Sequence, residues 1–152
     1  MDIIPVSVLV IESHPLMREA LCAAIVDEPD LKVGLQVADG AEALQMLKIV
    51  RPDIVVIALG NPGLHELKTL GMLHKSLPEA PILALTSNEV AGQEQAALES
   101  GACAVLTKAT PRVELISKLQ ELRTMVIMNH SQVNSDKEEN RTNIHSYTGL
   151  HR

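Results

Sequence analysis

Aromatic side chains are almost missing from this sequence of 152 residues, which contains no Trp, no Phe and a single Tyr. A hydrophobic core must therefore be built from Leu, Ile, Val, Ala and Met. Apolar residues nevertheless make up 46% of the chain. Length and composition together predict one domain with a substantial core, and they leave too little chain for two.

Basic residues are also few: 13 Lys and Arg stand against 19 Asp and Glu, and the net charge is −6. A surface that binds phosphate groups normally makes a domain basic. We therefore do not expect this chain by itself to bind nucleic acid.

Long apolar runs and cysteines are scarce as well. No run approaches the ~20 residues of a membrane span, so we expect no membrane contact. The first residues lack the basic start and the cleavage site of a signal peptide. Cys22 and Cys103 are far apart among apolar or small residues, which indicates buried free thiols. These features predict a cytoplasmic protein.

The sequence does contain short apolar runs that alternate with longer stretches of helical period. Four almost unbroken runs are typical of strands buried on both faces, whereas LKVGLQV alternates like a half-exposed edge strand. The expected strands are 6–11, 31–37, 54–59, 81–85 and 104–107. Helices are expected from Pro15, after Asp39, around Leu67–Leu73, over Glu89–Ser100 and from Thr110-Pro111.

Five strand–helix repeats predict an α/β fold, a flavodoxin-like (βα)5 doubly wound parallel sheet with strand order 2-1-3-4-5. This order places the alternating second strand at an edge. We assign the domain to residues 1–128. Residues 129–152 have few apolar side chains, mixed charges and many Asn and Ser, which predicts a polar linker or disordered tail.

The functional crevice of an open parallel sheet lies outside the carboxyl ends of the strands. Polar residues are found at three of these ends: Glu12 and Ser13 follow the first strand, Thr86 follows the fourth and Lys108 follows the fifth. The third strand ends instead at Ala58, shortly before a Gly-Asn-Pro-Gly turn. The sequence therefore predicts a polar crevice with a methyl group at its centre.

Five segments, in this order and at this spacing, resemble the receiver domains of bacterial two-component response regulators. The closest likeness is the LuxR-type, NarL/FixJ-like subfamily, in which a receiver is joined to a helix-turn-helix. The likeness covers roughly residues 5–125. The segments are VLVIESHPLMREAL, VADGAEALQML, RPDIVVIALGNPG, PILALTS and GACAVLTKATPRVEL.

In that family, two adjacent acidic residues after the first strand hold Mg²⁺, and an aspartate at the end of the third strand accepts a phosphoryl group. A Thr or Ser and a Lys complete the site, and an aromatic residue on the fifth strand reorients on activation. The resemblance implies that this switch position is Val105 here. It assigns a degenerate phosphorylation pocket to Glu12, Ser13, Ala58, Gly60, Thr86 and Lys108.

Ala58, at the position of the phosphoryl acceptor, determines whether this chain can be phosphorylated. Phosphoryl transfer needs a carboxylate nucleophile within bonding reach of phosphorus, and a methyl group cannot serve. Asp53 is no substitute, because five strand residues put it roughly 16 Å away at the other end of the sheet. Glu12 beside Ser13 is a poor anchor for Mg²⁺, which prefers about six oxygen ligands. We expect no phosphorylation, no metal, no cofactor, no catalytic residue and no enzymatic activity.

Lys108 and Thr86 must have other roles here than in the family, because no phosphoryl group is expected in the pocket. Lys108 pairs with Glu12 and ties the first strand to the fifth, or it carries its charge into water along its flexible stem. In the family, the hydroxyl group at the position of Thr86 contacts the phosphoryl oxygens. Without them, we expect a local hydrogen bond or a cap on the fourth helix.

The fifth helix continues its apolar pattern beyond the length needed to cover the sheet. We expect this end to contact a second copy in a homodimer or a neighbouring effector domain, and ordinary core packing is the alternative. The function predicted is a phosphorylation-independent receiver of a LuxR-type transcriptional regulator, reaching DNA only through a helix-turn-helix domain that is not present in this chain. The alternative is a stand-alone adaptor or antagonist that binds a kinase or another regulator. The interface candidates are Leu122, Met125, Val126 and Met128.

Overall fold

A five-stranded parallel sheet with the order β2-β1-β3-β4-β5 forms the centre of the molecule, as the sequence predicts. The computed structural model describes residues 3–150, and it describes side chains as far as residue 131. The strands are β1 (Val6–Ile11), β2 (Leu31–Val37), β3 (Ile54–Ala58), β4 (Ile82–Thr86) and β5 (Ala104–Thr107). The helices are α1 (Pro15–Val26), α2 (Gly40–Met46), α3 (Leu64–Ser76), α4 (Gln93–Ser100) and α5 (Arg112–Leu150).

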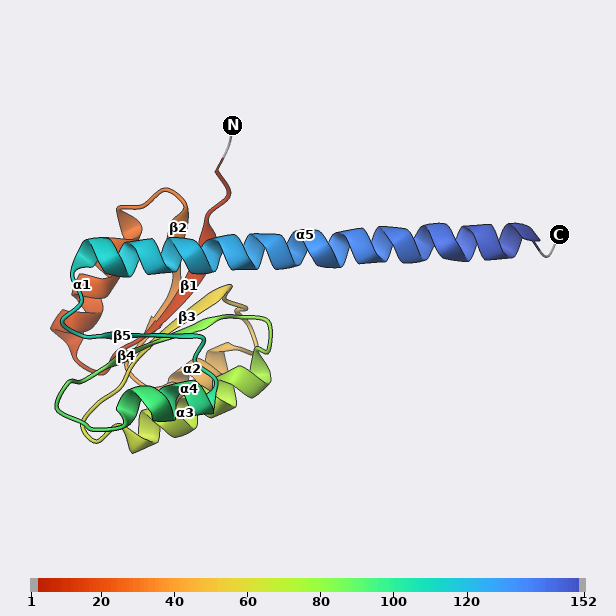
Figure 1. Cartoon of the computed structure of the whole chain (residues 1–152). Helices are drawn as coiled ribbons and strands as arrows, with labels where there is room; N and C mark the ends of the chain where they lie inside the picture. Colours follow the sequence, from red (N-terminus) through yellow and green to blue (C-terminus); the bar gives the residue numbers. More distant parts are fainter. Residues whose placement is uncertain (1–2, 151–152) are drawn as a thin grey trace.

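The helices cover the sheet on both faces, with α1 and α5 on one side and α2, α3 and α4 on the other (Figure 1). Each face has its own apolar cluster. Ile25 and Leu119 are fully buried in the first cluster, and Leu70 and Leu73 in the second. All residues of β3 and β4 are buried, which explains their unbroken apolar sequences.

The strands at the two edges are more exposed than the central ones. Along β2, exposed or half-buried residues alternate from Lys32 to Gln36 between two buried ends, as expected for an edge strand. All four residues of β5 are half-buried. The alternation in the sequence therefore identified the edge position of β2 correctly.

Local sequence signals explain where most helices begin. Pro15 occupies the first turn of α1, and Asp39 caps α2 by accepting a hydrogen bond from the Glu42 amide at 2.9 Å. The fourth helix, predicted around Glu89–Ser100, ends at Ser100 as expected, but its predicted start was wrong, since α4 begins at Gln93. The reason is Gly92, whose φ of 76° lies in the left-handed region and separates the preceding loop from the helix.

The last helix, α5, continues well past the sheet, as Figure 1 shows. We predicted a polar linker or tail over residues 129–152, whereas the backbone stays helical to Leu150. Residues 129–148 contain neither Pro nor Gly, so nothing in their sequence breaks a helix. Val126 is the last buried residue among the described side chains, close to the predicted boundary at residue 128. Within the described residues, no helix is long and apolar enough to cross a membrane.

Candidate functional site

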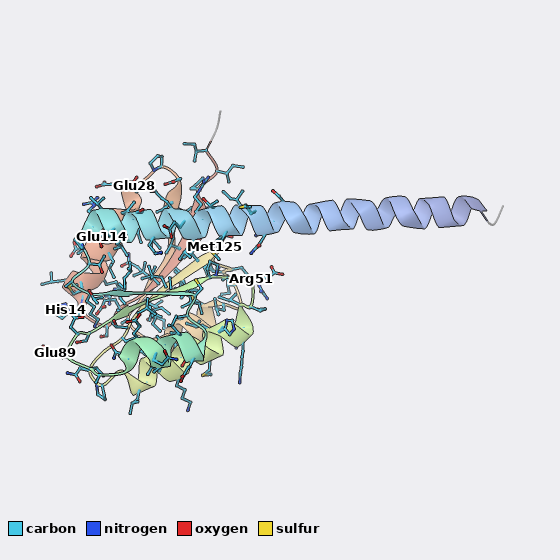
Figure 2. All side chains as sticks on the ribbon, viewed as in Figure 1. His14, Glu28, Arg51, Glu89, Glu114 and Met125 are labelled. Atoms are coloured by element: carbon cyan, nitrogen blue, oxygen red, sulfur yellow. The ribbon has the colours of Figure 1, made fainter. Side chains whose placement is uncertain are left out.

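The predicted site residues lie together at the carboxyl edge of the sheet. Strand register brings them there: Ile11 pairs with Ile57, Ala58 with Leu85, and Thr86 with Thr107. Glu12 and Lys108 directly follow the ends of β1 and β5. Figure 2 shows His14 and Glu89 on this side of the molecule, opposite Arg51.

Glu12 is a buried carboxylate, with 4% of the residue exposed. Its Oε1 accepts a hydrogen bond from the amide of His14 at 3.0 Å. Its backbone carbonyl accepts another from Nη1 of Arg18 at 2.8 Å. The first turn of α1 therefore holds Glu12 in place at the end of β1.

Ala58 is the last residue of β3 and is 6% exposed. Its methyl group belongs to the apolar cluster beneath α1 and α5. The nearby acid in the sequence, Asp53, lies before the other end of β3, where its Oδ2 accepts a hydrogen bond from the amide of Ser7 at 2.8 Å. Asp53 thus has a structural role, far along the strand from Ala58.

Thr86 and Lys108 take the local roles that we expected without a phosphoryl group. The Thr86 hydroxyl donates to the carbonyl of Leu106 at 3.4 Å, a long bond that links β4 to β5. Lys108 is exposed. The salt bridges of the described residues are Arg112–Asp27 and Lys118–Glu121, so the proposed pair between Lys108 and Glu12 is not formed.

Gln93 was missed by the sequence analysis, although it is 3% exposed and joins two loops at this edge. Its Nε2 donates to the carbonyls of Gly60 at 2.8 Å and Pro62 at 3.1 Å. Its Oε1 accepts from the amide of Ser87 at 2.8 Å. The only signal in the sequence is its spacing of four residues from the buried Ala97, which places both on one face of α4.

Glu66 completes this arrangement from α3 by accepting a hydrogen bond from the amide of Gly60 at 2.8 Å. A Cβ at residue 60 would lie 2.6 Å from the Glu66 Oε1. At Gly63, φ is 83° and a Cβ would lie 2.6 Å from the Gln93 Nε2. The glycines of the turn therefore leave room for the two side chains that fix it.

A cleft of about 290 Å³ lies between α1 and the segment that leads from β5 into α5. Met17, Ala20, Leu21 and Ala24 share one face of α1, at the spacing of successive helical turns. Leu85 and Leu115 complete the apolar part of the lining. The polar residues of the lining are Glu12, Thr107, Lys108, Thr110 and Arg112.

The predicted interface residues on α5 fall into two groups. Leu122 and Val126 are 3% and 6% exposed and pack in the core of the chain's own sheet, so we withdraw them as interface candidates. Met125, labelled in Figure 2, and Met128 are 46% and 66% exposed. Helical geometry explains the division, because 122 and 126 share the face that covers the sheet.

Two other predictions concern the cysteines and metals. Cys22 is buried as expected, and burial raises the pKa of its thiol. Cys103 is exposed, which corrects the prediction that it is buried, because it lies just before the half-buried edge strand β5. Among the described residues, no group of three or more His, Cys, Asp and Glu side chains is arranged to hold a metal ion.

Comparisons with known proteins agree on one family. Residues 8–120 match the response regulator receiver domain. The chain is 32% identical over 111 residues to a protein-glutamate methylesterase/protein-glutamine glutaminase from Anaeromyxobacter dehalogenans, covering 73% of this chain but only 32% of that protein. The chain thus spans about a third of that relative's length.

Solved structures lead to the same family. The signal receiver domain of the response regulator NarL from Mycobacterium tuberculosis is 26% identical, with a TM-score of 0.70 over 79% of this chain and 97% of that one. A LuxR family two-component response regulator from Aurantimonas is 26% identical, with a TM-score of 0.71 over 80% of this chain and 86% of that one.

Proposed function

Because this chain belongs to the response regulator receiver domain family, we propose that it is an atypical receiver that signals without phosphorylation. One observation carries the proposal: the side chain at the carboxyl end of β3, where the family resemblance locates the phosphoryl acceptor, is the methyl group of Ala58. A methyl group has no lone pair with which to attack phosphorus. Ala58 is buried in the apolar cluster beneath α1 and α5, and Glu12 at the end of the neighbouring strand is hydrogen-bonded to the start of α1.

The donor set at this edge does not fit Mg²⁺. This ion prefers about six oxygen ligands in octahedral order, generally anchored by carboxylates. Glu12 offers one carboxylate, of which Oε1 already accepts from His14. Ser13 supplies a neutral hydroxyl in place of a second acid, and Ala58 supplies no oxygen. We therefore propose that this edge uses no metal ion and that the chain catalyses no reaction.

The two loops that frame the pocket are already fixed by protein groups. Gln93 bonds Gly60, Pro62 and Ser87, and Glu66 bonds Gly60 from the other side. These bonds occupy backbone groups that would have to be released for the loops to rearrange around a phosphoryl group. The arrangement supports a receiver with one loop conformation rather than two.

Surface contacts are then the output that we propose. Met125 and Met128 on α5 are exposed, and α5 leads away from the sheet toward residue 150. We propose that this end of α5 contacts a second copy or an effector domain, as a LuxR-type regulator would require. DNA contact would then belong to a helix-turn-helix domain outside this chain. The likeness to a LuxR family structure supports this version.

The mechanism is tested by incubating the full chain with acetyl phosphate or beryllofluoride and Mg²⁺. Intact mass and amide NMR spectra should stay unchanged. A double variant with Ser13→Asp and Ala58→Asp serves as the matched control, since it restores an acidic pair and a carboxylate at the end of β3. A stoichiometric phosphoryl adduct on the wild-type chain would overturn the proposal.

The alternative is an adaptor or antagonist that binds a kinase or another regulator. The oligomeric state distinguishes it from a receiver that acts through self-association. A receiver acting through self-association gives an apparent molar mass, measured by light scattering, that rises with concentration. A chain that stays monomeric, yet binds a purified kinase, would favour the adaptor.

A further inference from the structure

The cleft between α1 and the start of α5 has the features of a ligand site, which the proposed function does not use. Its volume of about 290 Å³ is close to the lower end of ligand pockets, about 300–1,000 Å³. Ala20 and Ala24 create the space, because their short side chains face the β5–α5 segment where longer ones would fill it. Met17, Leu21 and Leu115 provide apolar walls around that space.

Glu12 supplies a negative charge at the end of β1. The residue is 4% exposed, and its Oε2 accepts no hydrogen bond from the described residues, although it is not sealed from solvent. The cleft that Glu12 lines provides the path to that solvent. A carboxylate in such surroundings is stabilised by a cation that enters the cleft.

Lys108 supplies a positive charge from the opposite wall. It is exposed, and it takes part in neither of the two salt bridges of the described residues. The other cation of the lining, Arg112, already pairs with Asp27 of the α1 C-terminal cap. The hydroxyls of Thr107 and Thr110, 3.4 Å apart, add polar groups near Lys108.

The lining therefore presents an anion, a cation and an apolar surface within one small cleft. We propose that the cleft binds a free amino acid with an apolar side chain. Its ammonium group contacts Glu12, its carboxylate contacts Lys108, and its side chain lies against Met17, Leu21 and Leu115. A segment of a protein chain fits less well, because its residues do not carry an ammonium and a carboxylate group on the same carbon atom, as a free amino acid does.

The ligand would connect α1 to the segment that leads into α5. Bound amino acid would thus stabilise the contact between these elements and raise the unfolding temperature of the chain. This inference stands apart from the proposed function, because it depends on neither the absence of phosphorylation nor the contacts of α5.

The test uses the full chain and three probes that share one branched apolar body: L-leucine, 3-methylbutylamine and 4-methylpentanoate. The amine lacks the carboxylate, and the acid lacks the ammonium group. Titration calorimetry and amide NMR should show leucine binding with shifts confined to α1 and the β5–α5 segment. Each analogue should bind at least about tenfold more weakly, since a hydrogen bond to a charged group is lost.

Variants locate the site. Glu12→Gln keeps an oxygen for the His14 amide but should weaken leucine at least about tenfold, and Lys108→Met should do the same. Ala20→Leu should abolish binding by filling the cleft, while Ala23→Leu, exposed on the outer face of the same helix, should leave it unchanged. Circular dichroism checks that every variant folds.

Three outcomes would overturn the inference. The first is an absence of binding by leucine, methionine and phenylalanine at millimolar concentration. The second is equal binding of leucine and 4-methylpentanoate, which would remove the role of Glu12. The third is leucine binding that survives Ala20→Leu in a folded protein.

Discussion

At the scale of single residues, the carboxyl edge of the sheet is held by side chains that satisfy backbone groups. Gln93 makes three such bonds, which join the loops that follow β3 and β4, and Glu66 makes one, which joins the loop after β3 to α3. Buried polar groups of this kind contribute mainly because leaving their partners unsatisfied is costly. The four bonds therefore restrain the backbone of both loops.

Replacing Gln93 by Ala should lower the free energy of unfolding by about 1–3 kcal/mol, because three backbone groups lose their partner. Urea unfolding followed by circular dichroism measures the change. Gln95→Ala is the matched control, since Gln95 is exposed on the same helix and should change stability by less than about 0.5 kcal/mol. Equal effects of the two variants would contradict the role assigned to Gln93.

At the scale of elements, α5 has two parts with different surroundings. Between residues 115 and 126, the side chains that pack on the sheet are buried in the cluster shared with α1; they are Leu115, Ile116, Leu119, Leu122 and Val126. Beyond that point the helix continues to Leu150. Helices in proteins obtain most of their stability from tertiary packing, so the first part is the one that anchors α5.

Leu119→Ala tests this anchor. Leu119 is fully buried, and truncation should destabilise the fold by about 2–5 kcal/mol through lost burial and a residual cavity. Thermal unfolding and urea titration measure the effect. Val113→Ala on the first turn of α5, 80% exposed, should change stability by less than about 0.5 kcal/mol. A small effect of the Leu119 change would show that α5 is not anchored there.

At the scale of the whole molecule, the surface where α5 leaves the sheet is where the contacts of the proposed function would form. Exposed apolar side chains gather where α5 leaves the sheet: Met125, Ile127 and Met128 are 46%, 41% and 66% exposed. Arg123 on the same helix donates to the carbonyl of Ile4 at 3.1 Å, so the N-terminal segment, with Ile3 and Ile4 exposed, lies alongside. Clusters of this kind mark interaction surfaces when they are contiguous.

Changing Met125 and Met128 together to Glu should weaken self-association at least about tenfold, since charges would replace apolar contacts. Analytical ultracentrifugation over a range of concentrations measures the dissociation constant. Lys118→Ala and Glu121→Ala together form the control, because they remove an exposed salt bridge on the same helix and should leave association unchanged. A wild-type chain that stays monomeric at every concentration would contradict the dimer.

Much of this protein was determined by its sequence. The unbroken apolar runs specified strands buried on both faces, and the alternation of β2 specified an edge, because side-chain period and burial are linked directly. Ala58 is also a property of the sequence alone, since no packing can give a methyl group a lone pair. The order of the strands was predicted from the flavodoxin-like pattern of strand–helix repeats.

Tertiary structure decided the rest. Only packing showed that Leu122 and Val126 face the sheet while Met125 and Met128 face outward, that Lys108 does not pair with Glu12, and that Gln93 joins two loops. The cleft beside α1 exists because segments distant in sequence come together around two alanines. A sequence pattern records which residues tend to be buried, but a contact depends on distances between atoms that only the folded chain brings together.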